Sequence, residues 1–521
     1  MARPRQNAVE DMQAREVPIS ILQWGGMNSD DPASAIMINE YAVAQNFDYI
    51  SDRIIRTRMG TTELMGNGVT GSAAALLGPI VFRPNGASPR IYFATNLGKY
   101  YSVDIAGGTP TLIGDLTTGV PVRRVKAVAF KNRIWIADGY KAWVYNPSGT
   151  PELEEVDLPL ESTARVVDVK VLYSRVWFLS DEDDFIASAP NNPDSYAVED
   201  DAWQATIAEN DGQNNWSLVA WGKTLVVTKQ DTETRMASMY KLSGYDISTF
   251  RIDDMFGDIS NPTGFMGDSA VAIGNDVIGL TYDGFTTLSA VNNFNEASIN
   301  TLSQKVDNYV RRINWDAQHH ITAIYDMQTR QYLCAVPLDG SPVNNFVFVY
   351  SPRYQLWAFY DNWDVRNFFN VKNVVHFTTN DGRIIRTRDT HADEGGGFTK
   401  RLLSANWHFD SPDAIKFFKS VEAELMVYGA HTVTVTPYLD GTRYSEGAVG
   451  ITGAAGTRWD TFVWDVAYWD SDPNLLRNIR LLHRAKALQL EYLNSNANEP
   501  FALKSVTIRS FVTDSGDPRV H

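Results

Sequence analysis

A hexapeptide occurs twice in this chain, and the residues between its two copies form a series of hairpin patterns at nearly even spacing. The sequence Arg-Ile-Ile-Arg-Thr-Arg stands at residues 53–58 and again at 383–388. Blades of β-propellers recur every ~40–50 residues and contain four strands each, so such a spacing predicts a ring of blades. The turn centres of the hairpin patterns lie near residues 52, 98, 139, 183, 232, 284, 340 and 382.

The turns and the segments around them have the chemistry of tight β-hairpins. Asp-Gly pairs at 138–139, 283–284 and 381–382 can adopt the positive φ angles that such turns need. The flanking segments are β-branched and aromatic, as at 134–137, and further short strands such as 126–130 precede several hairpins. We therefore expect an all-β fold with a β-propeller of about seven blades, six or eight being alternatives.

The first and last hairpins of the series carry the same hexapeptide, which suggests that the ring closes between them. We expect the N-terminal strands to complete or abut the last blade. A β-sandwich, or several unrelated β-domains, is the alternative fold. Eight hairpins at near-even spacing suit a ring better than either of these.

The chain has 521 residues, and this length predicts two to four domains. We assign residues 1–20 to an N-terminal arm, 21–395 to the propeller and 398–521 to a C-terminal β-sandwich-like domain. A Gly-Gly-Gly run at 395–397 marks the last boundary. Apolar residues at helical spacing predict a helix over 298–316, packed against the ring as an insertion, with Thr301 and Gln304 at capping-box spacing.

The charge and cysteine content restrict the classes of function. The formal net charge is −16, which argues against a general nucleic-acid binder but allows DNA to slide past an acidic wall. Cys334 is the only cysteine, so no intramolecular disulfide is possible, as suits synthesis in a reducing cytosol. No stretch of 18 apolar residues and no apolar leader segment occurs, so we expect no membrane segment and no export signal.

The sequence contains no spacing typical of a catalytic, cofactor or metal site. One cysteine excludes a zinc-finger pattern, and phosphate-binding loops, nucleophile elbows and dinucleotide fingerprints are absent. Among the eight histidines, His319 and His320 are adjacent, and on a strand they would point to opposite faces. We therefore predict no enzyme activity, no catalytic residue, no cofactor and no metal.

Three acidic clusters, at 181–184, 199–201 and 253–254, leave an alternative open. Carboxylates gathered by propeller loops could cleave glycosidic bonds or bind calcium. Solvated turn residues are the favoured interpretation. A basic run could contact phosphate or an acidic partner, although the solvated face of a strand or short helix is again favoured. It comprises Arg477, Arg480, His483, Arg484 and Lys486.

The N-terminal segment carries a pattern in three parts. Trp-Gly-Gly-Met-Asn at 24–28 is followed by Gln-Asn at 45–46, and then by the Arg-rich hexapeptide with Gly60 shortly after it. This pattern resembles the opening of tail nozzle proteins of short-tailed bacteriophages, also called tail tubular protein B or packaged-DNA stabilisation protein. The signature residues are Gly25, Gly26, Asn28, Gln45, Asn46, Arg53, Arg56, Arg58 and Gly60.

The resemblance implies a structural virion protein that is made in the host bacterial cytoplasm and resides in the virion tail. Such proteins assemble as a ring, expected to be hexameric, below the portal and its tail adaptor protein. The ring extends the DNA exit channel, helps to retain packaged DNA and holds tail fibres or a tail needle. Double-stranded DNA would pass through without sequence-specific binding. The alternatives are a glycan-binding or glycan-cleaving propeller of a phage tail, and a cytosolic propeller scaffold unrelated to viruses.

Overall fold

The fold was analysed in a computed structural model. It describes residues 17–66, 74–231, 233–255, 264–290, 297–409, 412–427, 430–445, 448–452 and 474–512. The chain divides into two compact units. One consists of Met1–Arg58 together with Gly397–His521, and we call it the terminal β-domain. The other is Met59–Gly396, and we call it the propeller.

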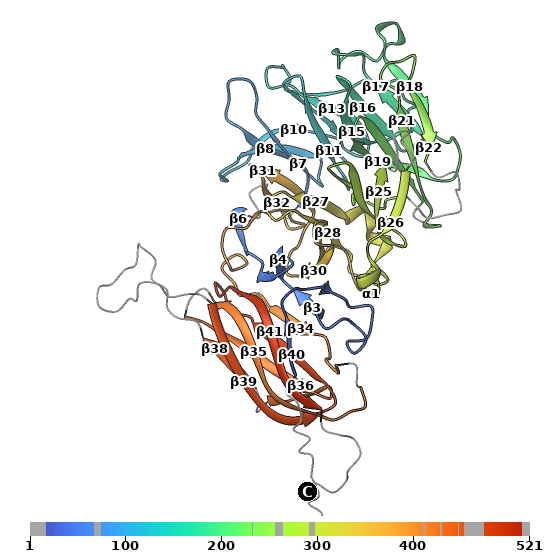
Figure 1. Ribbon diagram of the computed structural model, residues 1–521. Coiled ribbons are helices and arrows are strands. Elements are labelled where there is room, and N and C mark those ends of the chain that lie inside the picture. Colours follow the sequence, from blue (N-terminus) through green and yellow to red (C-terminus); the bar gives the residue numbers. More distant parts are fainter. Residues whose placement is uncertain are drawn as a thin grey trace, which may run out of the picture. The chain divides into compact units, whose positions relative to one another are not determined.

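The propeller consists of seven blades, each made of four antiparallel strands paired in succession, which we number 1 to 7 in chain order (Figure 1). Neighbouring inner strands contact one another around the ring, and the inner strand of blade 7 contacts that of blade 1. Blade 1 consists of β7 (Leu76–Phe82), β8 (Arg90–Thr95), β9 (Lys99–Asp104) and β10 (Thr111–Asp115), and blade 2 consists of β11 (Lys126–Phe130), β12 (Arg133–Ala137), β13 (Ala142–Tyr145) and β14 (Leu153–Glu155). Blade 3 consists of β15 (Val166–Leu172), β16 (Arg175–Ser180), β17 (Asp184–Ala187) and β18 (Trp203–Thr206). Blade 4 consists of β19 (Asn214–Trp221), β20 (Thr224–Gln230), β21 (Ala237–Ser243) and β22 (Arg251–Asp254).

The remaining three blades follow the same plan, with the innermost strand given first. Blade 5 is β23 (Val271–Ile273), β24 (Asp276–Thr281), β25 (Gly284–Ala290) and β26 (Ala297–Thr301), blade 6 is β27 (Thr322–Asp326), β28 (Gln331–Val336), β29 (Phe346–Ser351) and β30 (Leu356–Tyr360), and blade 7 is β31 (Asn367–Val371), β32 (Val374–Thr378), β33 (Ile384–Thr387) and β6 (Thr61–Met65). The expected count of seven blades is confirmed.

Seven of the eight expected hairpins are the second and third strands of the seven blades. These middle strands are buried on both faces, as β16 and β28 illustrate, because each blade packs between two others. Strands that are buried on both faces appear in the sequence as continuous apolar runs, so these strands were the easiest to predict. Trp177 of β16, for example, lies in a core cluster with Leu225 and Val227 of the next blade.

The ring closes because a strand from its N-terminal side completes blade 7. Strand β6 pairs antiparallel with β33, with Thr61 opposite Thr387 and Met65 opposite Ile384. This pairing covers the outer edge of β33 and joins the two ends of the propeller by backbone hydrogen bonds. The expected closure is therefore present, but the strand that makes it follows the first hexapeptide.

The terminal β-domain is built from both ends of the chain, in two sheets. Its longest strands alternate mostly between buried and partly buried residues, as β35 (Lys416–Val427) shows. The first sheet has the order β39 (Asn474–Ala485), β35, β41 (Phe501–Val512), β5 (Ile54–Thr57) and β4 (Phe47–Ser51), and β1 (Val17–Ile21) also pairs with β41. The second sheet contains β2 (Gly26–Met27), β3 (Glu40–Gln45), β34 (Lys400–Ser404), β40 (Leu488–Asn494), β36 (Thr432–Leu439), β37 (Thr442–Arg443) and β38 (Val449–Thr452).

This composition corrects the expected domain boundaries. Residues 21–58 were assigned to the propeller, but strands β4 and β5 pair with each other and with β41 of the terminal β-domain. The first hexapeptide therefore belongs to this domain and the second to blade 7, because the same local sequence can form an inner strand of either sheet. Of the expected arm, residues 1–16 lie outside the described residues, while β1 pairs with β41.

The helix expected over 298–316 is also corrected. Residues Ala297–Thr301 form β26, the outer strand of blade 5, and only Asp307–Val310 form an α-helix, α1. Two 3-10 turns, η2 (Gln304–Val306) and η3 (Trp315–His320), flank it. Pairing with β25 supplies backbone hydrogen bonds that a helix start would have to replace, so tertiary context overrides the helical spacing.

Candidate functional site: the propeller axis

The residues that meet at the propeller axis come from the innermost strands and the loops that lead into them. Arg124 precedes β11 of blade 2, and its guanidinium reaches three other blades. Its Nη1 donates to the carbonyl oxygen of Val167 in blade 3, at 2.9 Å, and to that of Trp216 in blade 4, at 2.5 Å. The guanidinium carbon also lies 4.9 Å from the centre of the Trp216 ring.

The same arginine forms an ion pair with Asp268, which precedes blade 5. Arg124 Nη2 lies 2.5 Å from Asp268 Oδ1, and Lys126 Nζ lies 2.8 Å from Asp268 Oδ2. Burial by itself would raise the pKa of Asp268, but the charges of Arg124 and Lys126 outweigh burial and hold that pKa well below its usual range. Asp168 of β15 lies 3.7 Å from Arg124 and adds a second negative charge.

A second arginine, Arg366, links blades 6, 7 and 2. It precedes β31, donates to the carbonyl oxygen of His319 at 3.1 Å, and also donates to the carbonyl oxygen of Arg123. Its Nη1 lies 3.0 Å from Nδ1 of His320. A guanidinium can only donate, so this ring nitrogen accepts and His320 is neutral.

The two histidines lie in η3 rather than on a strand, so the expectation of opposite faces does not apply. Their ring centroids are 4.3 Å apart. Burial, with the charges of Arg366 and Arg123, lowers the pKa of His319 to about 4. Burial, with Arg366 and His319, lowers the pKa of His320 to about 3. Both rings are therefore uncharged at neutral pH.

A polar pocket of about 400 Å³ opens beside this network. Five polar atoms of residues around it are buried out of reach of solvent and have no hydrogen-bond partner within the described part of the chain: both side-chain polar atoms of Asn215, Nε1 of Trp216, Nε2 of Gln230 and Oε1 of Gln318. Three arginines and three aspartates also line it. They are Arg123, Arg124, Arg165, Asp181, Asp231 and Asp316.

No motif in the sequence marks this site. Of its residues only Asp181, His319 and His320 drew attention in the sequence, because single polar residues at the starts of inner strands form no motif. A signal did exist: Arg124, Asp268 and Arg366 each stand only a few positions before an inner strand of a blade. Alignment of the blades on their inner strands would have gathered these positions.

The acidic clusters are not brought together into one site. In the first cluster, Asp181 accepts from the backbone N–H of Arg165, and Asp183 pairs with the buried Lys229. In the second, Asp200 accepts from the hydroxyl of Ser195 at 2.6 Å. In the third, Asp253 accepts from Ser243 at 2.8 Å. These carboxylates hold turns and strand edges in place.

The basic run of the sequence can also be placed. The basic residues from 477 to 486 lie on or next to β39 with exposed side chains, as the favoured interpretation expected. Within the described ranges, no group of three or more His, Cys, Asp or Glu residues is placed to hold a metal ion. No helix of those same ranges is long and apolar enough to cross a membrane.

The signature residues other than Gly60 lie in the terminal β-domain. Asn46 has a φ of 64°, and its Oδ1 accepts from Nε of Arg58 at 2.8 Å. Its Nδ2 donates to the carbonyl oxygen of Thr399 at 2.6 Å. The guanidinium of Arg58 lies 4.0 Å from the ring centre of Phe398. Asn46 and Arg58 thereby tie the N-terminal strands to the returning chain near residue 398.

The other signature residues are placed separately. Asn28 is buried and donates to Glu40 at 3.0 Å. Gly26 has a φ of 79°, and a Cβ at Gly25 would lie 2.7 Å from Cγ of Glu40. Gly60 belongs to the propeller, where a Cβ would lie 2.0 Å from the carbonyl oxygen of Ala392. Gln45 lies opposite Arg401 in β34, and Arg53 is exposed. Nε of Arg56 is buried and has no hydrogen-bond partner among the residues that the structure describes.

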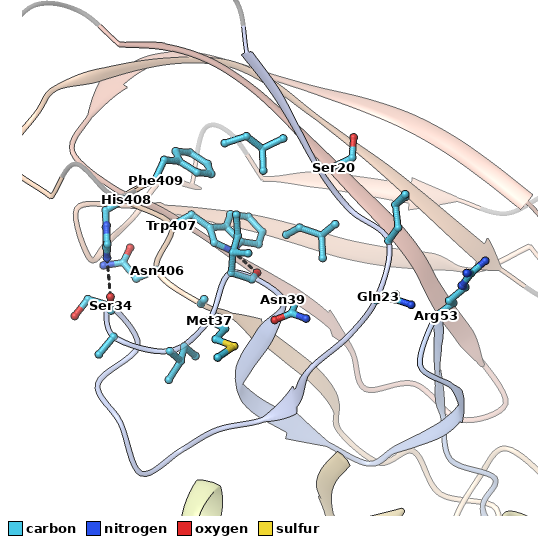
Figure 2. Close-up of a pocket in the computed structure, with 17 residues that line it drawn as sticks. Ser20, Gln23, Ser34, Met37, Asn39, Arg53, Asn406, Trp407, His408 and Phe409 are labelled. Carbon is cyan, nitrogen blue, oxygen red and sulfur yellow. Dashed lines mark hydrogen bonds between the residues drawn. The ribbon is translucent and has the colours of Figure 1, made fainter. Parts of the chain in front are cut away.

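A groove of about 1280 Å³ lies within the terminal β-domain (Figure 2). The loop that contains Met37, the segment after β34 that contains Trp407, and residues 19–23 line it. His408 Nε2 lies 2.7 Å from the carbonyl oxygen of Ser34, and Trp407 Nε1 donates to that of Ile38, as the dashed lines in Figure 2 mark. Large apolar side chains are exposed here, with Leu22 60% and Met37 69% accessible.

Comparison with known proteins adds little. No model of a known protein family matches the chain, and no curated protein matches it. Among solved structures, BBS1N in complex with ARL6DN is 12% identical with a TM-score of 0.43, over 64% of this chain and 99% of that one. The computationally designed Ika8 protein is 12% identical with a TM-score of 0.38, over 63% and 99%. The propeller assignment stands on the seven blades themselves.

Proposed function

We propose that this protein is a structural component of a short phage tail, a nozzle subunit that assembles into a ring below the portal and its adaptor. The observation that carries the proposal is the N-terminal signature, whose residues act as scaffold. Asn46 and Arg58 join the two ends of the chain in one domain, and Gly60 permits close packing against Ala392 at the start of the propeller. In this proposal the signature preserves an architecture and has no chemical task.

The axis of a single propeller does not serve as the DNA channel in this proposal. Arg124 and Arg366 reach across the axis to other blades, so side chains occupy that space. The channel is instead the central opening of the ring of subunits, and the net charge of −16 keeps DNA from adhering to its wall. Tail fibres or a tail needle attach to the distal side of the ring.

Ring assembly requires two complementary surfaces on each protomer. We assign one of them to the groove of the terminal β-domain and its occupant to a second copy of this chain. Soluble monomers rarely leave contiguous apolar patches exposed, and Leu22, Met37 and Ile38 are exposed together along this groove. Burial of these side chains in the ring would remove them from water.

The mass of the purified protein in solution tests this assignment. Size-exclusion chromatography with light scattering should give six times the mass of one chain at high protein concentration. Leu22→Asp combined with Met37→Asp should shift the protein to the monomer without lowering its melting temperature. Val198→Asp, at an equally exposed apolar residue of the propeller, serves as the matched control and should leave the ring intact. A wild-type protein that stays monomeric at all concentrations contradicts the proposal.

The alternative function, a glycan-cleaving tail protein, receives less support. Two carboxylates about 5–10 Å apart, one of them with a raised pKa, are expected for that chemistry. Burial raises the pKa of Asp181 and of Asp184, but Asp181 accepts from Arg165 N–H and Asp184 lies near Gln204 on the outer strand of its blade. Turnover of a polysaccharide that is lost in Asp181→Asn would favour the alternative.

A further inference from the structure

A row of basic side chains runs along the edge of one sheet of the terminal β-domain. Strand β39 is the outermost strand of this sheet, and among the described strands it pairs only with β35. Four exposed cations on β39 or directly after it have no carboxylate within ion-pair distance in the described part of the chain. They are Arg477, Arg480, Arg484 and Lys486, and we call them the basic row.

The basic row differs from the interior of the same sheet, where cations are paired. Nε of Arg509, for example, lies 3.1 Å from Oε1 of Glu422. Two large apolar side chains of β39 also stand exposed next to the row, with Leu476 66% and Leu482 60% accessible. Arginine is enriched at protein interfaces, and burial of exposed leucines is favourable, so this edge has the composition of a contact surface.

A row of acidic side chains lies on the outer edge of blade 2, in the propeller. Strand β14 is the outermost strand of this blade, and no lysine or arginine stands between Lys141 and Arg165. Partly buried leucines of this segment pack against the cores of the blades, and the acidic residues between them face solvent. Four of these exposed acids have no cation within ion-pair distance among the residues that the structure describes. They are Glu152, Glu154, Asp157 and Glu161, and we call them the acidic row.

The two rows match in number and extent and are opposite in sign. Each has four charges within ten positions of the chain, at 477–486 and at 152–161, which span at most ~30 Å when extended. Like charges side by side repel one another, and a surface of opposite charge relieves this repulsion. Complementary potentials of this kind steer partners together. A second copy of this chain carries the complement of both rows.

We propose that the basic row of one subunit contacts the acidic row of the next subunit in the ring. The inference rests on the proposed nozzle function, because it specifies a contact that a ring of identical chains repeats. The two rows lie in different compact units, so the contact is heterologous, which is the type of contact that forms rings. The groove supplies apolar area, and the rows determine which face of the neighbour is accepted, since complementary charge contributes more to specificity than to affinity.

Reversal of either row tests this contact in the full chain. Arg480→Glu combined with Arg484→Glu makes both rows acidic, whereas Glu154→Lys combined with Asp157→Lys shifts both rows toward positive charge. Each double variant should weaken ring assembly about tenfold or more, as measured by light scattering across a dilution series at low salt. Each should keep the melting temperature of the wild type, because the changed side chains are exposed.

A mixture of the two double variants gives the most specific result. At equal amounts the reversed β39 edge of one variant meets the reversed β14 edge of the other, and the unchanged edges meet at the next contact. Rings of alternating subunits should therefore form, and a chain that carries all four substitutions should form the ring by itself. Glu233→Lys combined with Asp276→Lys reverses two exposed acids of other blades and is the matched control, which should assemble as the wild type does.

Three results would overturn the contact. They are a ring that persists when either row is reversed, a mixture that stays monomeric, and an Arg480→Glu, Arg484→Glu variant whose only defect is lost binding of duplex DNA in a mobility-shift assay. The last result would assign the basic row to phosphate groups. A wild-type chain that stays monomeric at every concentration would instead overturn the ring itself, and the nozzle function together with this contact.

Discussion

Nζ of Lys229 lies 2.7 Å from Oδ1 of Asp183 and 2.9 Å from Oδ1 of Asp211, with its side chain fully buried. The same nitrogen donates to the carbonyl oxygens of Ile207 and Ala208. Asp183 belongs to an acidic turn that could have been catalytic. Its carboxylate instead neutralises a buried lysine between blades 3 and 4, which gives it a structural role.

Removal of this lysine should destabilise the propeller. Lys229→Met leaves Asp183 and Asp211 close together without a counter-charge, and the loss of one partner of a buried ion pair costs ~3–5 kcal/mol. Chemical denaturation should show the loss as a lower midpoint. Glu182→Gln, at the exposed neighbouring acid, is the control and should stay within ~0.5 kcal/mol of wild type. Equal midpoints for the two variants would contradict the buried pair.

Loss of the carboxylate at the axis should have a similar effect. Asp268→Asn leaves Arg124 and Lys126 side by side with reduced compensation, so the free energy of unfolding should fall by ~3 kcal/mol or more. Asp276→Asn changes an exposed aspartate of the same blade and should be close to neutral. Thermal melting followed by circular dichroism distinguishes the two variants. An unchanged melting temperature for Asp268→Asn would show that the ion pairs of Arg124 and Lys126 with Asp268 do not stabilise the propeller.

The two axial histidines should make the propeller sensitive to mild acid. Their folded pKa values of about 4 and about 3 lie below the unfolded value of about 6.5, so between these limits the unfolded chain binds more protons. Stability should therefore fall as the pH drops from 6.5 toward 4, by at most about 1.4 kcal/mol per pH unit for each histidine. Partial exposure of the rings reduces this limit.

The double variant His319→Asn, His320→Asn isolates this effect, because the carboxylates that also titrate in acid are unchanged. The amide introduced at position 320 would still offer an oxygen to Arg366. Denaturation midpoints at pH 7, 6 and 5 should fall more steeply for the wild type than for the double variant. Parallel curves would show that the histidines are protonated equally in both states.

A side chain at Gly60 should disrupt the entry of the chain into the propeller. A Cβ there would lie 2.0 Å from the carbonyl oxygen and 2.6 Å from the backbone nitrogen of Ala392, both parts of the backbone that cannot move freely. We expect Gly60→Ala to lower the melting temperature by several degrees. At Gly66 a Cβ would meet only the mobile carboxylate of Glu63, so Gly66→Ala is the control and should melt with the wild type.

The propeller could be predicted because its middle strands are buried on both faces. Residues such as Val176, Trp177 and Phe178 form continuous apolar runs, and the Asp-Gly turns mark where each hairpin reverses. The domain boundaries could not be predicted in the same way. Strand β5 has the sequence of the second hexapeptide, yet it pairs with β41 at the other end of the chain, and no local feature encodes that long-range partner.

The residues at the propeller axis could not be predicted from the sequence either, because contacts between distant parts of the chain bring them together. Closure of the ring brings Arg124 within ion-pair distance of Asp268, which is 144 residues away in the sequence. It also brings Arg366 within hydrogen-bond distance of the carbonyl oxygen of Arg123. The prediction of a helix over residues 298–316 was wrong for a related reason. The spacing of its apolar residues was helical, but residues Ala297–Thr301 pair with β25 as strand β26.

The nozzle function is tested most directly by the location of the protein in viral particles. Antibodies against the purified chain, with a gold label, can be applied to particles sedimented from a lysate and viewed by negative-stain microscopy. If the protein is a nozzle subunit, the gold label should lie at a short tail beneath DNA-filled heads, where the protein forms a ring one subunit thick. Label found only in soluble fractions without heads would contradict it.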